Sequence, residues 1–442
     1  MEVKKFLSNA FEIGKMRLCS PKILGICIGL WVLFQIIYVS VYLFRENLGV
    51  DEGRYVYFAM ECVKHGTMYP DYSNFHNEFI HAPGWINFLI LWIKLFGSVY
   101  LIPYFNILLN IVVLYLLYKI AYKVTANKNI TYLALYLFIF LPANAIIVLN
   151  FYTEIPFEIL SLLSFYLVFS KKSWLVLLAG ICIALAQWIR PLGVAWMLAA
   201  IFFMLYKDKR IKHAIIYVVG VVFTCGSIGI ATHRNFPTYV FQSTTGSINV
   251  LLGANDMATG ASVVDALRSP EGLGYLPGLY SENEYIPVRA WRTGEFMHKY
   301  SNKYTYLECD SIYKARAIQW IKENPGRWCL LIPKKIYFLF YTTYAYIMMP
   351  DPINASFTSK IIWVICKITS RSFVLMVLCA LVGLLTPFWK DKKLIYVVIP
   401  IVVCSAMTVA TFGDPRFNFI IIPFILIFCC YSLKYYKNKY ID

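Results

Sequence analysis

The sequence predicts an all-α polytopic membrane protein with about ten transmembrane helices, and with twelve as the upper limit. Of its 442 residues, 60% are hydrophobic and only 15% are charged, whereas soluble proteins carry about 25% charged residues. Apolar runs of roughly 17–25 residues, the length that crosses a bilayer, recur along most of the chain. The lysines and arginines gather in short patches between these runs. The composition therefore predicts a multi-pass protein of the cell (inner or plasma) membrane.

The formal net charge of +17 indicates topology and contact with membrane lipids, and it predicts no nucleic-acid partner. Short basic loops stay on the cytoplasmic side of a membrane. All the basic patches and both termini fall on that side when ten spans are assigned to residues 23–44, 99–118, 130–149, 154–170, 174–189, 191–206, 214–232, 372–389, 394–411 and 417–433.

Three further apolar stretches are expected to lie at the membrane surface. Residues 84–97 are too short for an ordinary span, and counting them would move three lysines to the outer side. Residues 328–350 and 358–369 carry lysines within their apolar runs. Interfacial helices fit this pattern, and two further crossings are the alternative for the last two stretches.

The chain accordingly divides into four parts. Residues 1–22 form a basic cytoplasmic arm, and residues 23–232 form an N-terminal transmembrane module that contains an outer loop at 45–98. Residues 233–371 form an extracytoplasmic loop region with interfacial helices, because glycine- and proline-rich backbone must lie outside the hydrocarbon or be buried in protein. Residues 372–442 supply the last transmembrane helices and a cytoplasmic tail.

The first outer loop begins with an amphipathic helix that has Asp51 and Glu52 at its start. One interpretation makes Asp51 an N-cap, whose carboxylate accepts backbone N–H bonds. The other makes it a carboxylate held at the membrane surface, where a general base could meet an acceptor hydroxyl. The two interpretations are compatible.

Further along the same loop, a group of three side chains could bind a divalent metal ion. His76, Glu78 and His81 have the side-chain types that bind zinc. Their spacing is loose, and ordinary hydrogen bonds of interfacial histidines explain it better. No cofactor is therefore assigned, and a divalent metal stays open.

Two acidic residues occupy one face of the helix expected at 154–170. Glu154 lies at its start, where a carboxylate is favoured by the positive end of the helix. Glu158 lies about one turn deeper, where a charge costs roughly 2.5–3.5 kcal/mol at the bilayer centre. A deep acid is usually paired or functional, and Glu154 is less informative because it lies near the interface.

Three arginines are expected at the outer membrane edge. Arg190 lies between two apolar runs, so it needs an anionic partner, which is either Glu154 or Glu158 or a bound phosphate. Arg234 and Arg416 lie at the edges of other spans. Asp414 is the expected salt-bridge partner of Arg416.

Short motifs follow one another along the chain in a definite order: Asp51-Glu52, Tyr55, Ala59, Gly66, Tyr69-Pro70, His81-Ala82-Pro83-Gly84, Thr153-Glu154, Arg190-Pro191, Arg234-Asn235, Gly246 to Gly260, Ala317 to Lys335 with Asn324-Pro325, and Arg416. This order resembles that of GT-C glycosyltransferases, nearest the superfamily of protein O-mannosyltransferases and lipid A aminoarabinose transferases. The chain has His81-Ala82-Pro83 where aminoarabinose transferases have Lys-Pro-Pro. That difference argues against a phosphate-binding lysine and against lipid A as acceptor.

The resemblance implies a glycosyltransferase that moves a sugar from a polyprenyl phosphate to a glycan, lipid or protein hydroxyl at the outer face, with inversion at the anomeric carbon. It implies Asp51 as the catalytic base, with Glu52 as a second candidate and Glu154 as the second acidic position. Transfer also needs cations near the leaving phosphate, and the candidates are Arg190, Arg234, Arg416 and His81.

Two alternatives remain at this point. A transporter or flippase of lipid-linked glycans would also have many spans, although its common inverted repeats are not evident in the sequence. An O-antigen ligase or polymerase would use a diphosphate-linked donor. Release of polyprenyl monophosphate by the purified protein would distinguish the glycosyltransferase from both of these alternatives.

Overall fold

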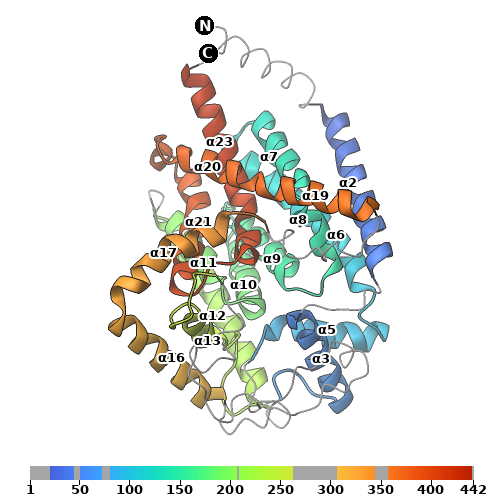
Figure 1. Cartoon of the computed structure of the whole chain (residues 1–442), viewed down its shortest axis with the longest axis vertical. Helices are drawn as coiled ribbons and strands as arrows, with labels where there is room; N and C mark the ends of the chain where they lie inside the picture. Colours follow the sequence, from blue (N-terminus) through green and yellow to red (C-terminus); the bar gives the residue numbers. More distant parts are fainter. Residues whose placement is uncertain are drawn as a thin grey trace.

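The computed structural model describes residues 20–43, 50–71, 80–206, 209–261, 306–343 and 357–440. Within these ranges every regular element is a helix, and the only extended pairing is an isolated bridge between Ala261 and Gly413. Figure 1 shows α3 and α5 side by side at one end of the molecule, far from the last turns of α23. The prediction of an all-helical chain is confirmed for this part of the sequence.

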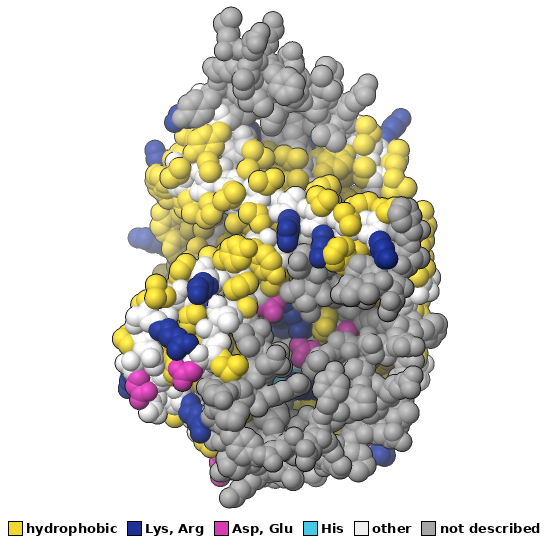
Figure 2. Space-filling model, in the orientation of Figure 1, with side chains coloured by type: hydrophobic (Ala, Val, Ile, Leu, Met, Phe, Trp, Pro, Cys, Tyr) yellow, Lys and Arg dark blue, Asp and Glu magenta, His cyan; other side chains and the backbone are white. Residues whose placement is uncertain are grey.

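Among the described residues, six helices are long and apolar enough to cross a membrane, namely Pro21–Tyr42 (α2), Ile102–Thr125 (α6), Ile211–His233 (α12), Trp363–Gly383 (the second half of α19 with α20), Lys392–Ala410 (α21) and Pro415–Tyr436 (α22 with most of α23). Lys128–Phe140 (α7) and Ala143–Leu149 (α8 and a 3-10 turn) form a bent apolar pair, which is either a seventh, broken span or a re-entrant loop. Hydrophobic side chains cover much of the upper half of Figure 2. The chain is a multi-pass helical membrane protein.

Ten complete spans are not found among the described residues. The helices at three predicted spans are Glu154–Leu167 (α9), Ser173–Ile189 (α10) and Val194–Leu205 (α11), with 14, 17 and 12 residues. At 1.5 Å per residue, none reaches the roughly 30 Å of the hydrocarbon core. One cause is visible between α10 and α11, because the residue before a proline disfavours helix and Arg190 precedes Pro191.

Helices also form at the stretches that the sequence predicts to lie at the membrane surface. Residues 84–97 correspond to Pro83–Phe96 (α5), which is too short to span, and the outer-loop helix is Val50–His65 (α3). Pro325–Phe340 (α17) overlaps the first part of the stretch 328–350, of which residues 344–350 lie outside the described ranges, and Phe357–Arg371 (α19) contains the stretch 358–369. The apolar segment Trp363–Gly383 runs through the predicted boundary at residue 372.

The bend between α7 and α8 is held by asparagine side chains. Pro142 follows the last turn of α7, and the two halves are bent by 69°. Nδ2 of Asn144 donates to the carbonyl of Phe138 at 2.8 Å, and Nδ2 of Asn106 donates to the carbonyls of Val148 and Asn150 at 3.1 Å. Non-helical backbone inside a membrane protein needs such internal partners. The bend delivers residues 150–153 to the candidate site.

Helices α10 and α12 pack closely because glycines face each other across the contact. A Cβ atom at Gly180 would lie 2.2 Å from the carbonyl oxygen of Tyr217, and one at Gly220 would lie 2.6 Å from that of Leu177. Small residues permit this approach between membrane helices. The packing fixes α10, whose last residue precedes Arg190.

A second, smaller core lies outside the main bundle. It joins Gly246–Leu252 (α13), Tyr306–Glu323 (α16) and α17 through Leu251, Tyr313, Trp320 and Leu331. Lys335 is buried where α17 meets the end of α21, and its Nζ donates to the carbonyl of Val409 at 3.0 Å. A lysine near the C-terminus of a helix complements the helix dipole.

Candidate active site

The turn at residues 150–153 attaches the outer-loop helix α3 to the bundle. The backbone N–H of Phe151 donates to Oε1 of Glu52 at 2.9 Å, and Nε1 of Trp85 donates to the carbonyl of Phe151 at 2.7 Å. Glu52 is only 2% exposed. Its carboxylate therefore holds α3 against the entrance of α9, which is a positioning role.

The next residues of the same turn contact two arginines. The ring of Tyr152 lies 4.3 Å from the guanidinium carbon of Arg416, within the range of a cation–π contact. Oγ1 of Thr153 accepts a hydrogen bond of 3.3 Å from Nη1 of Arg190. Glu154 then begins α9. Four consecutive residues thus contribute to one site.

Glu154 is the centre of an ion-pair network. Its Oε1 accepts from Nη1 of Arg190 at 2.6 Å and from Nε of Arg416 at 2.5 Å. Nη1 of Arg416 also donates to Oδ2 of Asp51. The side chain of Glu154 is fully buried, whereas that of Asp51 is 35% exposed. Alternating charges therefore run from the partly exposed Asp51 to the interior.

The members of this network come from distant parts of the chain. Asp51 lies in the first turn of α3, Arg190 follows α10, and Arg416 belongs to Pro415–Asn418 (α22). Acidic and basic side chains are visible together near the middle of the face in Figure 2. A buried carboxylate is strongly disfavoured without a counter-charge, so the two arginines explain how Glu154 can be ionised there.

The expected salt bridge between Asp414 and the Arg416 side chain is not formed. Oδ1 of Asp414 instead accepts from the backbone N–H of Arg416 at 2.7 Å and caps α22. An N-cap carboxylate satisfies a backbone donor at the helix start. This leaves the guanidinium to Asp51 and Glu154.

The outer-loop side adds Arg54 and His81. Nη1 of Arg54 lies 3.4 Å from Nε2 of His81, and the backbone N–H of His81 donates to the hydroxyl of Tyr69 at 3.1 Å. Arg54 lies three residues after Asp51 on α3, so both side chains face the same side of the helix. The site therefore has a third arginine.

The surrounding charges determine the protonation states of Asp51 and His81. Burial raises the pKa of Asp51, but Arg416 and Arg54 outweigh it and lower the pKa to about 2. Burial and, to a smaller extent, Arg54 lower the pKa of His81 to about 3, while Asp51 opposes the shift. At neutral pH the site presents an ionised Asp51 beside a neutral imidazole.

Glu158 lies one turn after Glu154 on α9, and its surroundings differ. Its side chain is fully buried, and neither carboxylate oxygen has a hydrogen-bond partner within the described ranges. An unpaired buried carboxylate is so costly that the group takes up a proton instead. Arg190, which the sequence offers to either acid, contacts Glu154.

The remaining predicted residues do not join this cluster. Arg234 is exposed at the end of α12, and no contact joins it to the site in the part of the chain that is described. His76 and Glu78 lie outside the described residues. No group of three potential metal ligands occurs among the residues that are described.

Two contributors were missed by sequence reasoning. Arg54 could have been found from its three-residue spacing after Asp51, which places both on one face of a helix. Tyr152 had no sequence signal, because its contact with Arg416 joins positions 264 residues apart across the α7–α8 bend.

The sequence matches no protein-family model, and it matches no curated protein.

Proposed function

We propose that this chain is a membrane glycosyltransferase of the GT-C type, which transfers a sugar from a polyprenyl phosphate to the hydroxyl of a glycan, lipid or protein. The observation that carries the proposal is the contact of Asp51 with Arg416 at the start of the outer-loop helix. It pairs a partly exposed carboxylate with a cation that also reaches into the bundle. These are the two kinds of group that the reaction requires.

In the proposed reaction, Asp51 accepts the proton of the acceptor hydroxyl. The acceptor oxygen forms a bond to the anomeric carbon while the bond between that carbon and the phosphate oxygen breaks. The electron pair of the broken bond stays on the leaving polyprenyl phosphate. Attack opposite to the leaving group inverts the anomeric carbon, and a positioned base contributes about 10²–10⁴-fold to the rate.

Arg416 has two tasks in this scheme. In the free site it lowers the pKa of Asp51, which makes the carboxylate a weak base. A donor phosphate near Arg416 would share the guanidinium and so weaken its hold on Asp51. The pKa of Asp51 would then rise towards its ordinary value when the donor is bound. Binding of the donor and activation of the base would thereby be coupled.

Arg54, Arg190 and the neutral His81 complete the proposed donor site. Arg54 and His81 lie on the side of Asp51, and each offers hydrogen-bond donors for a phosphate. Arg190 is largely buried against Glu154. It would therefore influence the phosphate indirectly, through Glu154 and Arg416, or contact it directly after its ion pair with Glu154 opens. Arg234 stays a prediction at the periphery. We place the site on the extracytoplasmic side, because the basic clusters then remain inside.

The test is an assay with purified full-length protein and a polyprenyl-phosphate sugar of defined composition. Release of free polyprenyl monophosphate together with a glycosylated acceptor is the expected result. Release of a diphosphate from a diphosphate-linked donor, with no reaction of the monophosphate donor, would favour an O-antigen ligase or polymerase.

A transporter of lipid-linked glycans is the second candidate, and Glu158 is the observation in its favour. Buried ionisable residues in membrane helices often belong to proton or substrate pathways. Protein in liposomes that moves the intact donor between leaflets, without breaking the sugar–phosphate bond, would support this candidate. Transfer activity that depends on Asp51 would exclude it as the main function.

A further inference from the structure

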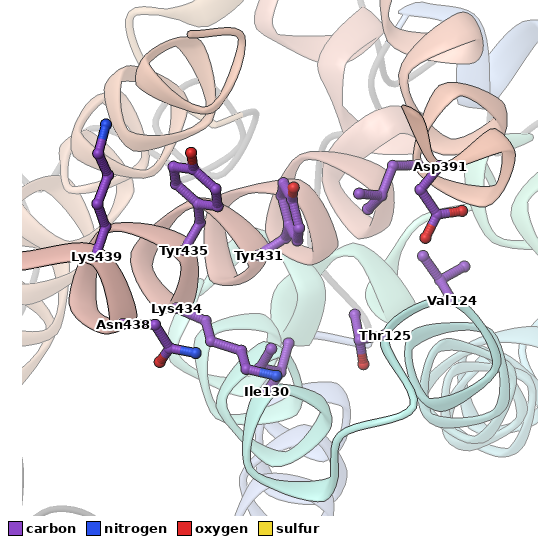
Figure 3. Close-up of a pocket in the computed structure, with 10 residues that line it drawn as sticks. Val124, Thr125, Ile130, Asp391, Tyr431, Lys434, Tyr435, Asn438 and Lys439 are labelled. Carbon is purple, nitrogen blue, oxygen red and sulfur yellow. The ribbon is translucent and has the colours of Figure 1, made fainter. Parts of the chain in front are cut away.

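A pocket of about 500 Å³ lies where the ends of four helices meet (Figure 3). Figure 1 shows the last turns of α23 far from α3, the helix that carries Asp51. Val124 and Thr125 come from the end of α6, Ile130 from the start of α7, and Asp391 caps α21. The fourth wall is the last part of Ile422–Tyr440 (α23). Measured along α23 from its first residue, at 1.5 Å per residue, this wall begins about 14 Å away at Tyr431 and ends about 26 Å away at Lys439. The pocket is therefore separate from the candidate active site.

One face of α23 lines the pocket with polar and aromatic side chains, namely Tyr431, Lys434, Tyr435, Asn438 and Lys439. Their spacing of three, four, seven and eight residues is that of a single helix face. In Figure 3 these side chains project from one stretch of α23, across from Thr125, Ile130 and Asp391.

The opposite part of the pocket is apolar. Val124, Ile130 and Leu394 line it, and all three are buried. The pocket therefore has an apolar base inside the bundle and a polar, hydroxyl-rich rim towards the helix ends. This arrangement fits an amphiphile better than a fully water-soluble ligand.

The charge of the rim favours an anion. The lining contains two lysines, Lys434 and Lys439, and one carboxylate, that of Asp391. Asp391 already accepts a hydrogen bond from the backbone N–H of Lys393 at 2.8 Å. Nζ of Lys393 donates to the carbonyl of Lys123 at 3.2 Å, which ties α21 to α6 beside the pocket and adds a further positive charge nearby.

We propose that this pocket binds the phosphate headgroup of an anionic phospholipid. The lysines and the tyrosine hydroxyls would hold the phosphate, and the apolar base would contact the glycerol and the first acyl carbons. Basic pockets between transmembrane helices bind anionic headgroups in this way. The proposal does not depend on the transferase function.

The test is native mass spectrometry of the full-length protein, titrated with phosphatidylglycerol. Lys434→Gln with Lys439→Gln should weaken binding of one lipid about 25-fold, since each lysine near the headgroup contributes about fivefold. The matched control is Lys171→Gln with Lys172→Gln, which removes two exposed lysines from the loop before α10. It should keep the affinity within about twofold.

A second variant tests the pocket without changing its charge. Thr125→Trp should fill the cavity and weaken the same binding event at least tenfold, while thermal unfolding of each variant shows that it is folded. Equal weakening by the control pair would indicate diffuse surface attraction and overturn the proposal. Binding that survives both the lysine pair and Thr125→Trp would do the same.

Two other ligands test whether binding requires both the charged headgroup and the acyl chains. Phosphatidylcholine should bind at least tenfold more weakly, because its headgroup carries no net charge. Glycerol 3-phosphate should not displace the lipid at equal concentration, because it lacks the acyl chains. Displacement by glycerol 3-phosphate would show a site for soluble phosphate compounds and contradict the lipid assignment.

Discussion

Two glutamates, one turn apart on α9, have opposite electrostatic surroundings. At the first turn, Glu154 is held by Arg190 and Arg416, and the network extends to Asp51. At the second turn, Glu158 is equally buried, but neither of its oxygens has a partner among the described residues. The same residue type is therefore part of a charged network at one turn and a neutral, uncompensated group at the next.

Nearby cations, rather than the degree of burial, therefore determine which carboxylate of this helix is ionised. Both arginines compensate the charge of Glu154, because the cost of removing a carboxylate from water is several kcal/mol. Glu158 avoids that cost by protonation.

The largest effect is expected from Asp51→Asn, which removes the exposed charge of the network. Asparagine keeps the shape of the side chain but cannot accept the hydroxyl proton. Transfer should fall about 10²–10⁴-fold while the protein stays folded. Turnover is measured with excess polyprenyl-phosphate sugar. Glu52→Gln is the control and should be milder, because Glu52 holds the Phe151 N–H rather than facing the solvent.

Turnover within a few-fold of wild type in Asp51→Asn would contradict the role of Asp51. The search for a base would then move to Glu154, the other carboxylate on Arg416.

The second-largest effect is expected from substitution of Glu154, and the matched substitution of Glu158 is its comparison. Glu154→Gln leaves Arg190 without its counter-charge and should lower the free energy of unfolding by about 3–5 kcal/mol. Glu158→Gln replaces one neutral group by another of similar shape and should change it by less than about 1 kcal/mol. Both values come from thermal or chemical unfolding of purified protein. Similar losses in the two variants would show that Glu158 is also charged and paired.

Arg190 is expected to have an intermediate effect. Arg190→Ala should cost about 2–3 kcal/mol, because Glu154 loses one of two charged hydrogen bonds but keeps Arg416. If Arg190 also contacts the donor phosphate, Arg190→Lys should not restore donor binding, since lysine lacks the bidentate fork. Donor affinity that is unchanged in Arg190→Ala would leave Arg190 as a structural partner only.

Much of the fold could be predicted because apolar runs and basic patches are local signals. Helix α2 begins at Pro21, two residues before the predicted span, and the interfacial character of 84–97 agrees with the short α5. The number of complete spans could not be read in this way. It depends on where helices stop, and α9 to α11 stop before they reach the length of a span.

The site was only partly predictable for a related reason. Each acid and arginine could be recognised from its type and its place at the edge of an apolar run. Which acid meets which arginine depends on the tertiary packing. The sequence predicted Asp414 as the salt-bridge partner of Arg416, and it did not decide between Glu154 and Glu158 as the acidic partner of Arg190. In the folded chain, Arg416 contacts Asp51, and both arginines contact Glu154.

The smallest expected effect concerns His81, which is neutral although it lies beside a carboxylate. Its pKa in the folded protein is about 3, below the ordinary value of 6.5, because burial and Arg54 disfavour the imidazolium. Between pH 6.5 and pH 3 the unfolded chain therefore binds a proton that the folded chain does not, and stability falls as the pH falls through this window. From pH 7 to pH 5 the loss should be about 1 kcal/mol, after allowance for the half-buried ring. Thermal unfolding at the two pH values should show this loss in the wild type and less of it in His81→Gln. His65→Gln, at an exposed position on α3, should keep the wild-type dependence. An unchanged dependence in His81→Gln would show that another group, and not this imidazole, gives the site its sensitivity to acid.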